Sequence, residues 1–365
     1  MIWTIWRQHR AEAGVAALIL AGLAAAMLIV GTIARDRARA HGLSACAHTH
    51  GDCGAALDTL HRDFHTIPPF TAALIAVPLL AGMFWAAPLV SREYEAGTHR
   101  LAWTQSVSPL RWITTKIVVI FSVLAAAALG LGLLATWTLD PLTAAFGGRY
   151  NSTWYDTQGL VPVACMIFAL AVGVAASAVI RRTIPAMAVT LFAYAAARIP
   201  IHWIRGHFWP PVARSVTTPF STLLQNPTAP IRDDFTSFTT ASDWVQTLTI
   251  TDPAGHTLIP DGSNLDTLSN YCPNFAPSTP ATSSGIPTLH RTAGPINVPA
   301  PPPPTKAQIA ACKPKVANLS LHEKITYQPA SHFWLVQTME SLIFAGLAAA
   351  LVAIAILAVT RHRPT

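Results

Sequence analysis

Charged residues are scarce in this chain of 365 residues, because Asp, Glu, Lys and Arg together make up only 11% of it. A soluble globular protein carries roughly a quarter of charged residues, so the deficit argues against a soluble protein. Hydrophobic residues make up 52% of the chain. They gather in runs of about 20 residues, the length that crosses the hydrocarbon core of a bilayer. The composition therefore predicts an integral membrane protein.

Several catalytic and nucleotide-binding motifs are also missing. The chain contains no G-x-x-x-x-G-K-[ST] phosphate loop, no G-x-S-x-G and no H-E-x-x-H. It therefore has no obvious means of binding ATP itself, and we expect no catalytic residues, no cofactor and no metal ion. The net charge of +7 comes from basic residues beside the apolar runs, not from a basic stripe with stacking aromatics. We therefore expect no nucleic-acid partner.

Six segments are apolar and long enough to cross a membrane. Because six is an even number, both chain termini are expected on one side. Before the first segment, Ile2–Arg10 combines Trp3 and Trp6 with basic residues, a pattern that predicts a short, separate interfacial helix. The predicted spans are Ala13–Ala34, Pro68–Val90, Ile113–Thr136, Leu160–Ile180, Ile184–Ile201 and Phe333–Thr360.

Basic residues near the span ends predict the orientation, because cytoplasmic loops carry an excess of Lys and Arg. The rule is contradicted after the first span by Arg35, Arg37 and Arg39. Basic residues at four other sites follow the rule, so we keep the orientation that they indicate. Both termini are therefore expected in the cytoplasm, in a multi-pass protein of the plasma membrane. The basic residues on the predicted cytoplasmic face are Arg7, Arg10, Arg92, Arg100, Arg111, Lys116, Arg181, Arg182, Arg361 and Arg363.

The five cysteines agree with this orientation. Cys165 lies in the fourth span and is expected to be a small buried apolar residue. Cys46 and Cys53 lie in the first outer loop, and Cys272 and Cys312 lie in the last one. All four thus fall on the outer side, where disulfides persist. They form two local candidate pairs, and the sequence leaves the pairing open.

A long polar region, His202–Ser331, separates the fifth and sixth spans. Its stretch SFTTASDWVQTLTI alternates like a pair of strands, and its prolines at 299–304 favour an extended polyproline segment. The region is either a small outer domain or partly disordered. The predicted fold is thus an all-α polytopic membrane protein with a large extracellular insertion. Its parts are residues 1–201 with five spans, 202–331 outside, and 332–365 with the sixth span and the tail.

The first outer loop contains several metal-binding residue types. His48, His50 and Cys53 are close in sequence, and His61 and His65 share one face if their segment is helical. A zinc site needs three or four ligands in a tetrahedral array, and nothing in the sequence fixes such an array. Histidines in a polar loop are usually solvated, so we expect no metal site.

Two ionisable residues lie inside the predicted spans, where charges are costly and often functional. Arg198 is near the outer end of the fifth span, and Glu340 is about two turns into the sixth. The two residues fall at similar depth and are expected to pair. The alternatives are that Arg198 extends to the membrane surface, or that Glu340 only holds helices together.

The stretch LVSREYEAGTHRLAWTQSVSPLRWITTK, which begins at Leu89, connects the second and third spans on the predicted cytoplasmic side. Residues 91–98 indicate a charged turn or helix end, because Gly97 can break a helix and Thr98 can cap the next one. The following HRLAWTQSV is amphipathic at helical spacing, and Pro109 ends it. The stretch predicts a short helix across the membrane surface, either an ordinary connector or a contact surface.

This stretch resembles the permease subunits of ABC-2 type exporters, in which the second span is followed by a pattern like E-R-E-x-G-T-x-x-x-L, a turn and a basic residue. REYEAGTHRLAWTQSVS is especially like the permeases common in high-GC Gram-positive bacteria. The family often has an acidic residue soon after Gly-Thr, where this chain has His99 and Arg100. The matching residues are Arg92, Glu93, Glu95, Gly97, Thr98, Trp103, Ser106 and Arg111.

The resemblance implies a transmembrane permease subunit of an ATP-driven exporter, with ATP bound by a separate ABC ATPase subunit. A second copy of the chain or a related permease would complete the transporter in the lipid bilayer. Residues 91–112 would be the ATPase-coupling element, with charged contacts from Glu93 and Glu95 and with Trp103 and Trp112 at the membrane surface.

The substrate and the class of protein are argued from other features. The spans carry few polar groups, so an apolar or amphipathic substrate is favoured over an ion. The alternative function is a membrane-anchored sensor or immunity protein, which binds a ligand through its extracellular loop without transport.

Overall fold

A computed structural model of the chain divides into two compact units. The first comprises Met1–Pro211, Ala241–Trp244 and Gln328–Thr365, and the second comprises Val212–Thr240 and Val245–Tyr327. The structure describes residues 2–41, 54–65, 67–97, 108–143, 146, 148–219, 224, 243–251, 257–258, 271–272, 304–317 and 319–361.

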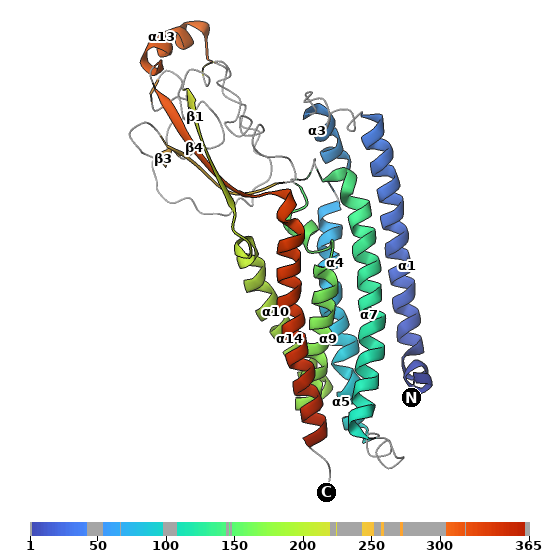
Figure 1. The fold of residues 1–365 in the computed structure, drawn as a ribbon. Coiled ribbons are helices and arrows are strands. Elements are labelled where there is room, and N and C mark those ends of the chain that lie inside the picture. Colours follow the sequence, from blue (N-terminus) through green and yellow to red (C-terminus); the bar gives the residue numbers. More distant parts are fainter. Residues whose placement is uncertain are drawn as a thin grey trace. The chain divides into compact units, whose positions relative to one another are not determined.

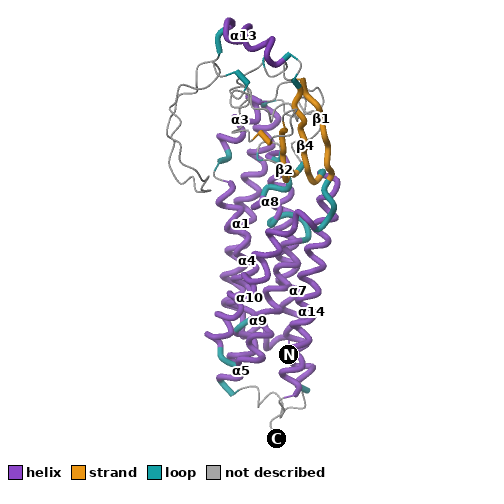
Figure 2. The backbone as a smooth tube through the Cα atoms, turned by 90° about the vertical axis from the view of Figure 1, so that its left-hand side faces the viewer, coloured by secondary structure: helices purple, strands orange, loops and turns teal. Residues whose placement is uncertain are grey.

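The first unit is a bundle of long apolar helices that run side by side (Figures 1 and 2). Six of its helical stretches are long and apolar enough to cross a membrane, which confirms the predicted all-α polytopic membrane protein. In Figure 1 the start of α1, the end of α14 and the short α5 lie at the same end of the bundle. The helices are α1 (Ile2–Ala40), α3 (Gly54–Asp63), α4 (Ile67–Ala81), α5 (Pro88–Glu95), α7 (Pro109–Leu139), α8 (Ser152–Tyr155), α9 (Val161–Ile180), α10 (Thr183–Ile204) and α14 (Phe333–Arg361).

The first helix differs from its prediction. The structure shows one uninterrupted helix, Ile2–Ala40, so the separate interfacial helix predicted over Ile2–Arg10 is wrong. The reason is local: residues 2–13 contain neither proline nor glycine, so nothing in the sequence ends a helix before the apolar run begins.

The same helix explains the basic residues that contradict the orientation rule. The helix continues beyond the predicted end at Ala34, so these arginines lie on its last turns. The guanidinium of Arg35 lies 3.7 Å from the centroid of the Trp137 ring in α7. Arg37 pairs with Asp63 of α3 at 3.3 Å. The partners of Arg35 and Arg37 lie in neighbouring helices. These basic residues therefore take part in helix packing at the end of the first span.

The second span is built from three consecutive pieces. α4 leads into a π-helical segment, Gly82–Ala86, and α5 follows from Pro88. Such π-bulges are frequent at functional sites. The segment also packs very closely on α9, because a Cβ atom added at Gly173 would lie 2.5 Å from the carbonyl oxygen of Gly82. The two backbones therefore touch, and glycine is required at this crossing.

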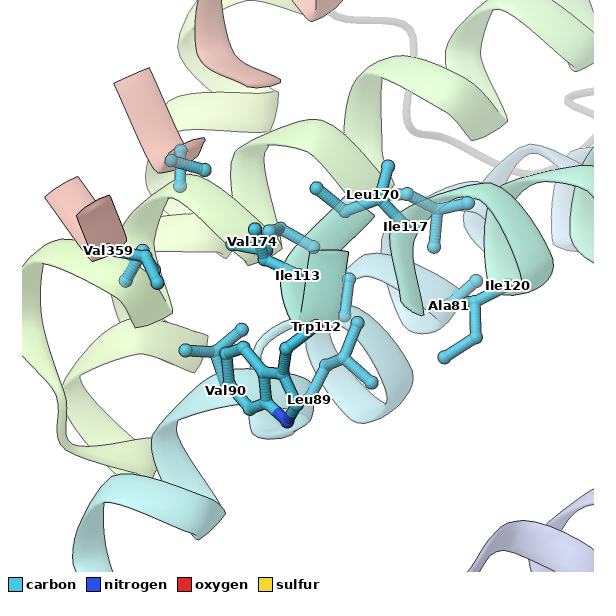
Figure 3. Packing of buried hydrophobic residues seen from close by; sticks show 14 of the residues in the cluster. Ala81, Leu89, Val90, Trp112, Ile113, Ile117, Ile120, Leu170, Val174 and Val359 are labelled. Atoms are coloured by element: carbon cyan, nitrogen blue, oxygen red, sulfur yellow. The ribbon is translucent and has the colours of Figure 1, made fainter. Parts of the chain in front are cut away.

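The core of the bundle surrounds α9, which packs against α14, α10, α7, α4 and α5. A helix that is apolar all round is expected to be buried, and most residues of α9 are. In Figure 3, Leu170 and Val174 of α9 lie beside Ile113 of α7. Trp112 belongs to the same cluster, packs near Leu89 and is only 4% exposed. Trp112 thus packs inside the bundle, and its level at the membrane surface stays a prediction.

The second unit contains a four-stranded sheet with the strand order β1-β4-β2-β3. β1 and β4 are antiparallel over their whole length, from Val212 opposite Tyr327 to Pro219 opposite Ser320. The stretch predicted to form a strand pair contains β2, whereas its residues before Asp243 lie outside the described part. The elements are β1 (Val212–Pro219), β2 (Trp244–Thr251), β3 (Thr257–Leu258), α13 (Lys306–Val316) and β4 (Ser320–Gln328).

A disulfide joins Cys272 to Cys312 within this unit, with 5.7 Å between their Cα atoms. Both cysteines belong to a small buried cluster that includes Ile325 and Tyr327 of β4. The bridge thus attaches α13 to the rest of the unit, beside the sheet core. Of the other predicted cysteines, Cys165 is free and buried in α9, and Cys46 and Cys53 lie outside the described residues.

Candidate functional site

The stretch between the second and third spans is described on both of its sides. α5 ends at Glu95, and Gly97 has a φ of +68°, a left-handed conformation that glycine adopts without strain. α7 begins after Ser108, whose side chain accepts a hydrogen bond from the backbone N–H of Arg111. The side chains of Arg92 and Arg111 are exposed. Of the predicted coupling residues, Thr98 and Trp103 lie outside the described residues.

Glu93 of α5 has its partner inside the bundle. Its carboxylate forms an ion pair with Lys116 of α7, and the two side chains are only 16% and 8% exposed. The Lys116 ammonium also lies 3.5 Å from the carbonyl oxygen of Leu89 and 4.4 Å from the centroid of the Trp112 ring. The family resemblance implies a contact between Glu93 and another protein, whereas the structure pairs Glu93 with the third span.

Glu95 of α5 holds the first residue of α10. Its Oε1 accepts from the backbone N–H of Thr183 at 2.9 Å, and its Oε2 accepts from the Thr183 hydroxyl at 2.8 Å. The Thr183 hydroxyl also lies 2.9 Å from the hydroxyl of Ser91. An ionised carboxylate has no proton to donate, so Thr183 donates to Glu95. The single proton of the Ser91 hydroxyl is shared between the Thr183 hydroxyl and the carbonyl oxygen of Ala87, to which Ser91 donates at 2.8 Å.

A fourth contact joins α5 to the turn between α9 and α10. The guanidinium of Arg181 lies 5.2 Å from the centroid of the Tyr94 ring. Arg181 closes α9 in a left-handed conformation, with a φ of 58°. We call the group of Ser91, Glu93, Tyr94, Glu95, Lys116, Arg181 and Thr183 the α5 junction. It fastens the end of the second span to the third, fourth and fifth spans.

A second polar site lies near the C-terminal end of α10. Asp156, which follows α8, accepts from Arg198 at 2.5 Å and from Arg205 at 2.6 Å. The ring nitrogen Nδ1 of His202 lies 3.5 Å from its other oxygen. Arg198 also pairs with Glu340 of α14, whose side chain is fully buried. We call these five residues the charge cluster.

The charge cluster extends the pair that the sequence predicts. The structure does bring Arg198 and Glu340 together, but sequence reasoning misses Asp156, His202 and Arg205. A signal for two of them is present, since positions 198, 202 and 205 are spaced four and three apart and share one helix face. No signal in the sequence assigns Asp156 as their common partner.

The ionisation of the cluster follows from its contacts. Burial by itself would raise the pKa of Asp156, but the contact with His202 and the charges of Arg198 and Arg205 outweigh it. The pKa of Asp156 is therefore lowered, and this carboxyl is ionised at neutral pH. Burial, and next the charge of Glu340, raise the pKa of the neighbouring Tyr155, so its hydroxyl stays protonated.

A cavity of about 40 Å³ lies beside the charge cluster. Side chains of α4, α7, α9 and α10 line it, and Asp156 and Arg198 form its polar end. This volume holds a few water molecules, whereas sites for small molecules measure roughly 300–1,000 Å³. In this conformation this cavity is therefore too small for a substrate.

Two histidines of the segment that follows the first span have partners in the structure. His61 of α3 stacks on Phe146, with 4.6 Å between the ring centroids. His65 Nδ1 lies 2.8 Å from the carbonyl oxygen of Arg62. Within the described part of the chain no group of His, Cys, Asp and Glu residues could hold a metal ion, and His48, His50 and Cys53 lie outside that part.

Comparison with protein families gives a match over half of the chain. Residues 17–205 match the model of the family described as ABC-2 membrane transporter related. The matched region contains the α5 junction and most of the first five spans. No curated protein and no solved structure matches the chain significantly.

Proposed function

Because the chain belongs to the ABC-2 membrane transporter related family, we propose that it is the permease subunit of an ATP-driven exporter. The α5 junction carries this proposal. A helix end with exposed arginines lies between the second and third spans, and a largely buried ion pair and more exposed polar contacts join it to three other spans. A protein that binds this surface could therefore move several spans at once, as a rigid body.

ATP binding belongs to a separate subunit in this proposal. The chain has no phosphate loop, so the driving closure comes from an ABC ATPase that docks against Arg92, the Gly97 turn and Arg111. Two copies of the permease, or this chain with a related one, bind two ATPase copies. The spans carry few polar groups, which favours an apolar or amphipathic substrate. The small cavity beside Asp156 would have to widen to hold such a molecule.

The docking surface can be tested by charge reversal. We expect Arg92→Glu with Arg111→Glu to weaken the complex with the ATPase more than tenfold, because removing charged interface contacts typically costs a few kcal/mol. The matched control is Lys313→Glu with Lys315→Glu, two exposed lysines of α13 in the other unit. The readout is the amount of ATPase that co-purifies with each variant, at equal permease yield.

Three outcomes of this experiment have distinct meanings. Loss of the ATPase in the α5–α7 variant and retention in the control support the proposed surface. Full retention in both variants contradicts it. If the wild-type chain itself recovers no ATPase, the sensor or immunity protein becomes the better account.

The orientation gives a second test. In the proposed topology, Cys272 and Cys312 face the outside of the cell, and both termini face the cytoplasm. After mild reduction of intact cells, we expect a membrane-impermeant thiol reagent to label the chain, and we expect Cys272→Ser with Cys312→Ser to remove that part of the signal. Cys165, buried in α9, should react only after denaturation. Labelling of Cys272 and Cys312 only after lysis contradicts the orientation.

A further inference from the structure

Ser91 and Glu95 lie one turn apart on the same face of α5, and both contact Thr183. The Thr183 hydroxyl donates to the Glu95 carboxylate at 2.8 Å and lies 2.9 Å from the Ser91 hydroxyl, whose proton is also within reach of the Ala87 carbonyl oxygen at 2.8 Å. The carboxylate also accepts from the Thr183 backbone N–H at 2.9 Å. One residue of α10 is thus held at three points by α5.

The position of Thr183 makes this contact effective. Thr183 is the first residue of α10, where backbone N–H groups have no partner within the helix and the helix dipole favours a negative charge. Glu95 satisfies one of these groups, and charge-assisted hydrogen bonds are the stronger kind. The second span therefore caps the fifth, although 88 residues separate Glu95 from Thr183.

We infer that Ser91, Glu95 and Thr183 form a clasp that makes α5 and α10 move as one body when the ATPase closes. The inference rests on the proposed function and assigns Glu95 as a positioning residue, not as a contact for the ATPase. The ATPase binds to the exposed Arg92 and Arg111. The clasp then makes α10, the fifth span, move together with α5.

The same movement would displace the C-terminal end of α10. Arg198 lies 15 residues beyond Thr183, or about 22 Å along the helix at 1.5 Å per residue. Arg198 and Arg205 hold Asp156 in the charge cluster, and Arg198 lines the small cavity. A shift of α10 at the clasp would therefore displace the polar end of that cavity.

Thr183→Val tests the clasp, because valine keeps the shape of threonine and lacks the hydroxyl. The ATPase should still co-purify, but ATP hydrolysis by the complex should fall by roughly a few fold, because one of the hydrogen bonds of the exposed Glu95 carboxylate is lost and water replaces it only in part. Thr183→Ser restores the hydroxyl and should restore hydrolysis. Thr190→Val is the matched control, since that hydroxyl bonds only to Ala186 of its own helix.

A cross-link tests the same inference by replacing the hydroxyl contacts with a covalent bond between α5 and α10. The hydroxyl oxygens of Ser91 and Thr183 lie 2.9 Å apart, so Ser91→Cys with Thr183→Cys places two sulfur atoms close enough to oxidise to a disulfide. We expect equal cross-linking with and without a non-hydrolysable ATP analogue, and unchanged ATP hydrolysis in the cross-linked complex.

The outcomes separate the clasp from the proposed function. Cross-linking in only one nucleotide state, or loss of hydrolysis on cross-linking, shows that α5 and α10 separate and overturns the inference. Normal hydrolysis in Thr183→Val also overturns it, as does loss of the ATPase from that variant, which would make the clasp part of the docking surface. If Thr183→Val fails to fold, the cross-link decides. If the proposed function itself is wrong, no ATPase co-purifies with the wild-type chain.

Discussion

Replacing Asp156 by alanine should destabilise the folded chain by about 3–5 kcal/mol, the typical cost of removing one partner from a buried ion pair. The change leaves Arg205 without its carboxylate and leaves Arg198 with Glu340 alone. The Asp156 side chain is only 4% exposed, so bulk solvent does not compensate the charges of the two arginines. The measurement is the midpoint of thermal unfolding in detergent, together with the amount of chain recovered from membranes.

Asp140→Ala is the matched control for this prediction. Asp140 also pairs with an arginine, Arg149 at 3.2 Å, but its side chain is 59% exposed. Exposed pairs contribute at most about 1 kcal/mol, so this variant should unfold close to the wild type. If the two variants unfold at the same midpoint, the charge cluster does not stabilise the bundle.

The lowered pKa of Asp156 fixes the sign of the pH dependence. A carboxyl whose pKa is lower in the folded state stabilises that state at pH values above its unfolded pKa of about 3.9. The stabilisation is lost as the pH falls through the folded value. The difference in unfolding midpoint between the wild type and Asp156→Asn should therefore be largest at neutral pH and should decrease below about pH 4.

Glu93→Ala should have a similarly large effect at the opposite end of the bundle. It leaves the Lys116 ammonium, 8% exposed, without its carboxylate, and we expect a loss of about 3–5 kcal/mol in stability. Glu93→Ala with Lys116→Met removes both charges and should recover much of that loss. The unfolding midpoints of the two single variants and the double variant, read as a double-mutant cycle, measure the coupling.

Asp36→Ala gives the baseline for this pair. Asp36 and its partner Arg39 are both 75% exposed, so its removal should change stability by less than about 1 kcal/mol. Strict additivity of the Glu93 and Lys116 changes would show that the buried pair does not interact. In that case Glu93 would be available to a partner protein, as the sequence alone suggests.

Much of the membrane fold could be predicted from the sequence, because a bilayer requires runs of about 20 apolar residues. The six spans are confirmed for this reason. The separate helix at Ile2–Arg10 is wrong because amphipathic character identifies a membrane-facing segment without saying where its helix ends. Similarly, composition alone cannot show the π-helical segment at Gly82–Ala86 or its contact with Gly173.

The sites were harder to predict, because their partners are distant in sequence. Arg198 and Glu340 could be paired by their depth in the spans. By contrast, Lys116 lies 23 residues from Glu93, and Thr183 lies 88 residues from Glu95. A charged stretch between two spans therefore suggests contacts with another protein, until the fold supplies partners within the chain.

The most direct test of the account is the composition of the complex in which the wild-type chain exists. The chain should be purified from its native membrane in mild detergent, and the intact complex weighed by native mass spectrometry. The account predicts two permease copies together with two copies of an ABC ATPase. A folded, membrane-extracted chain that carries no ATPase under conditions that preserve other transporter complexes would contradict it.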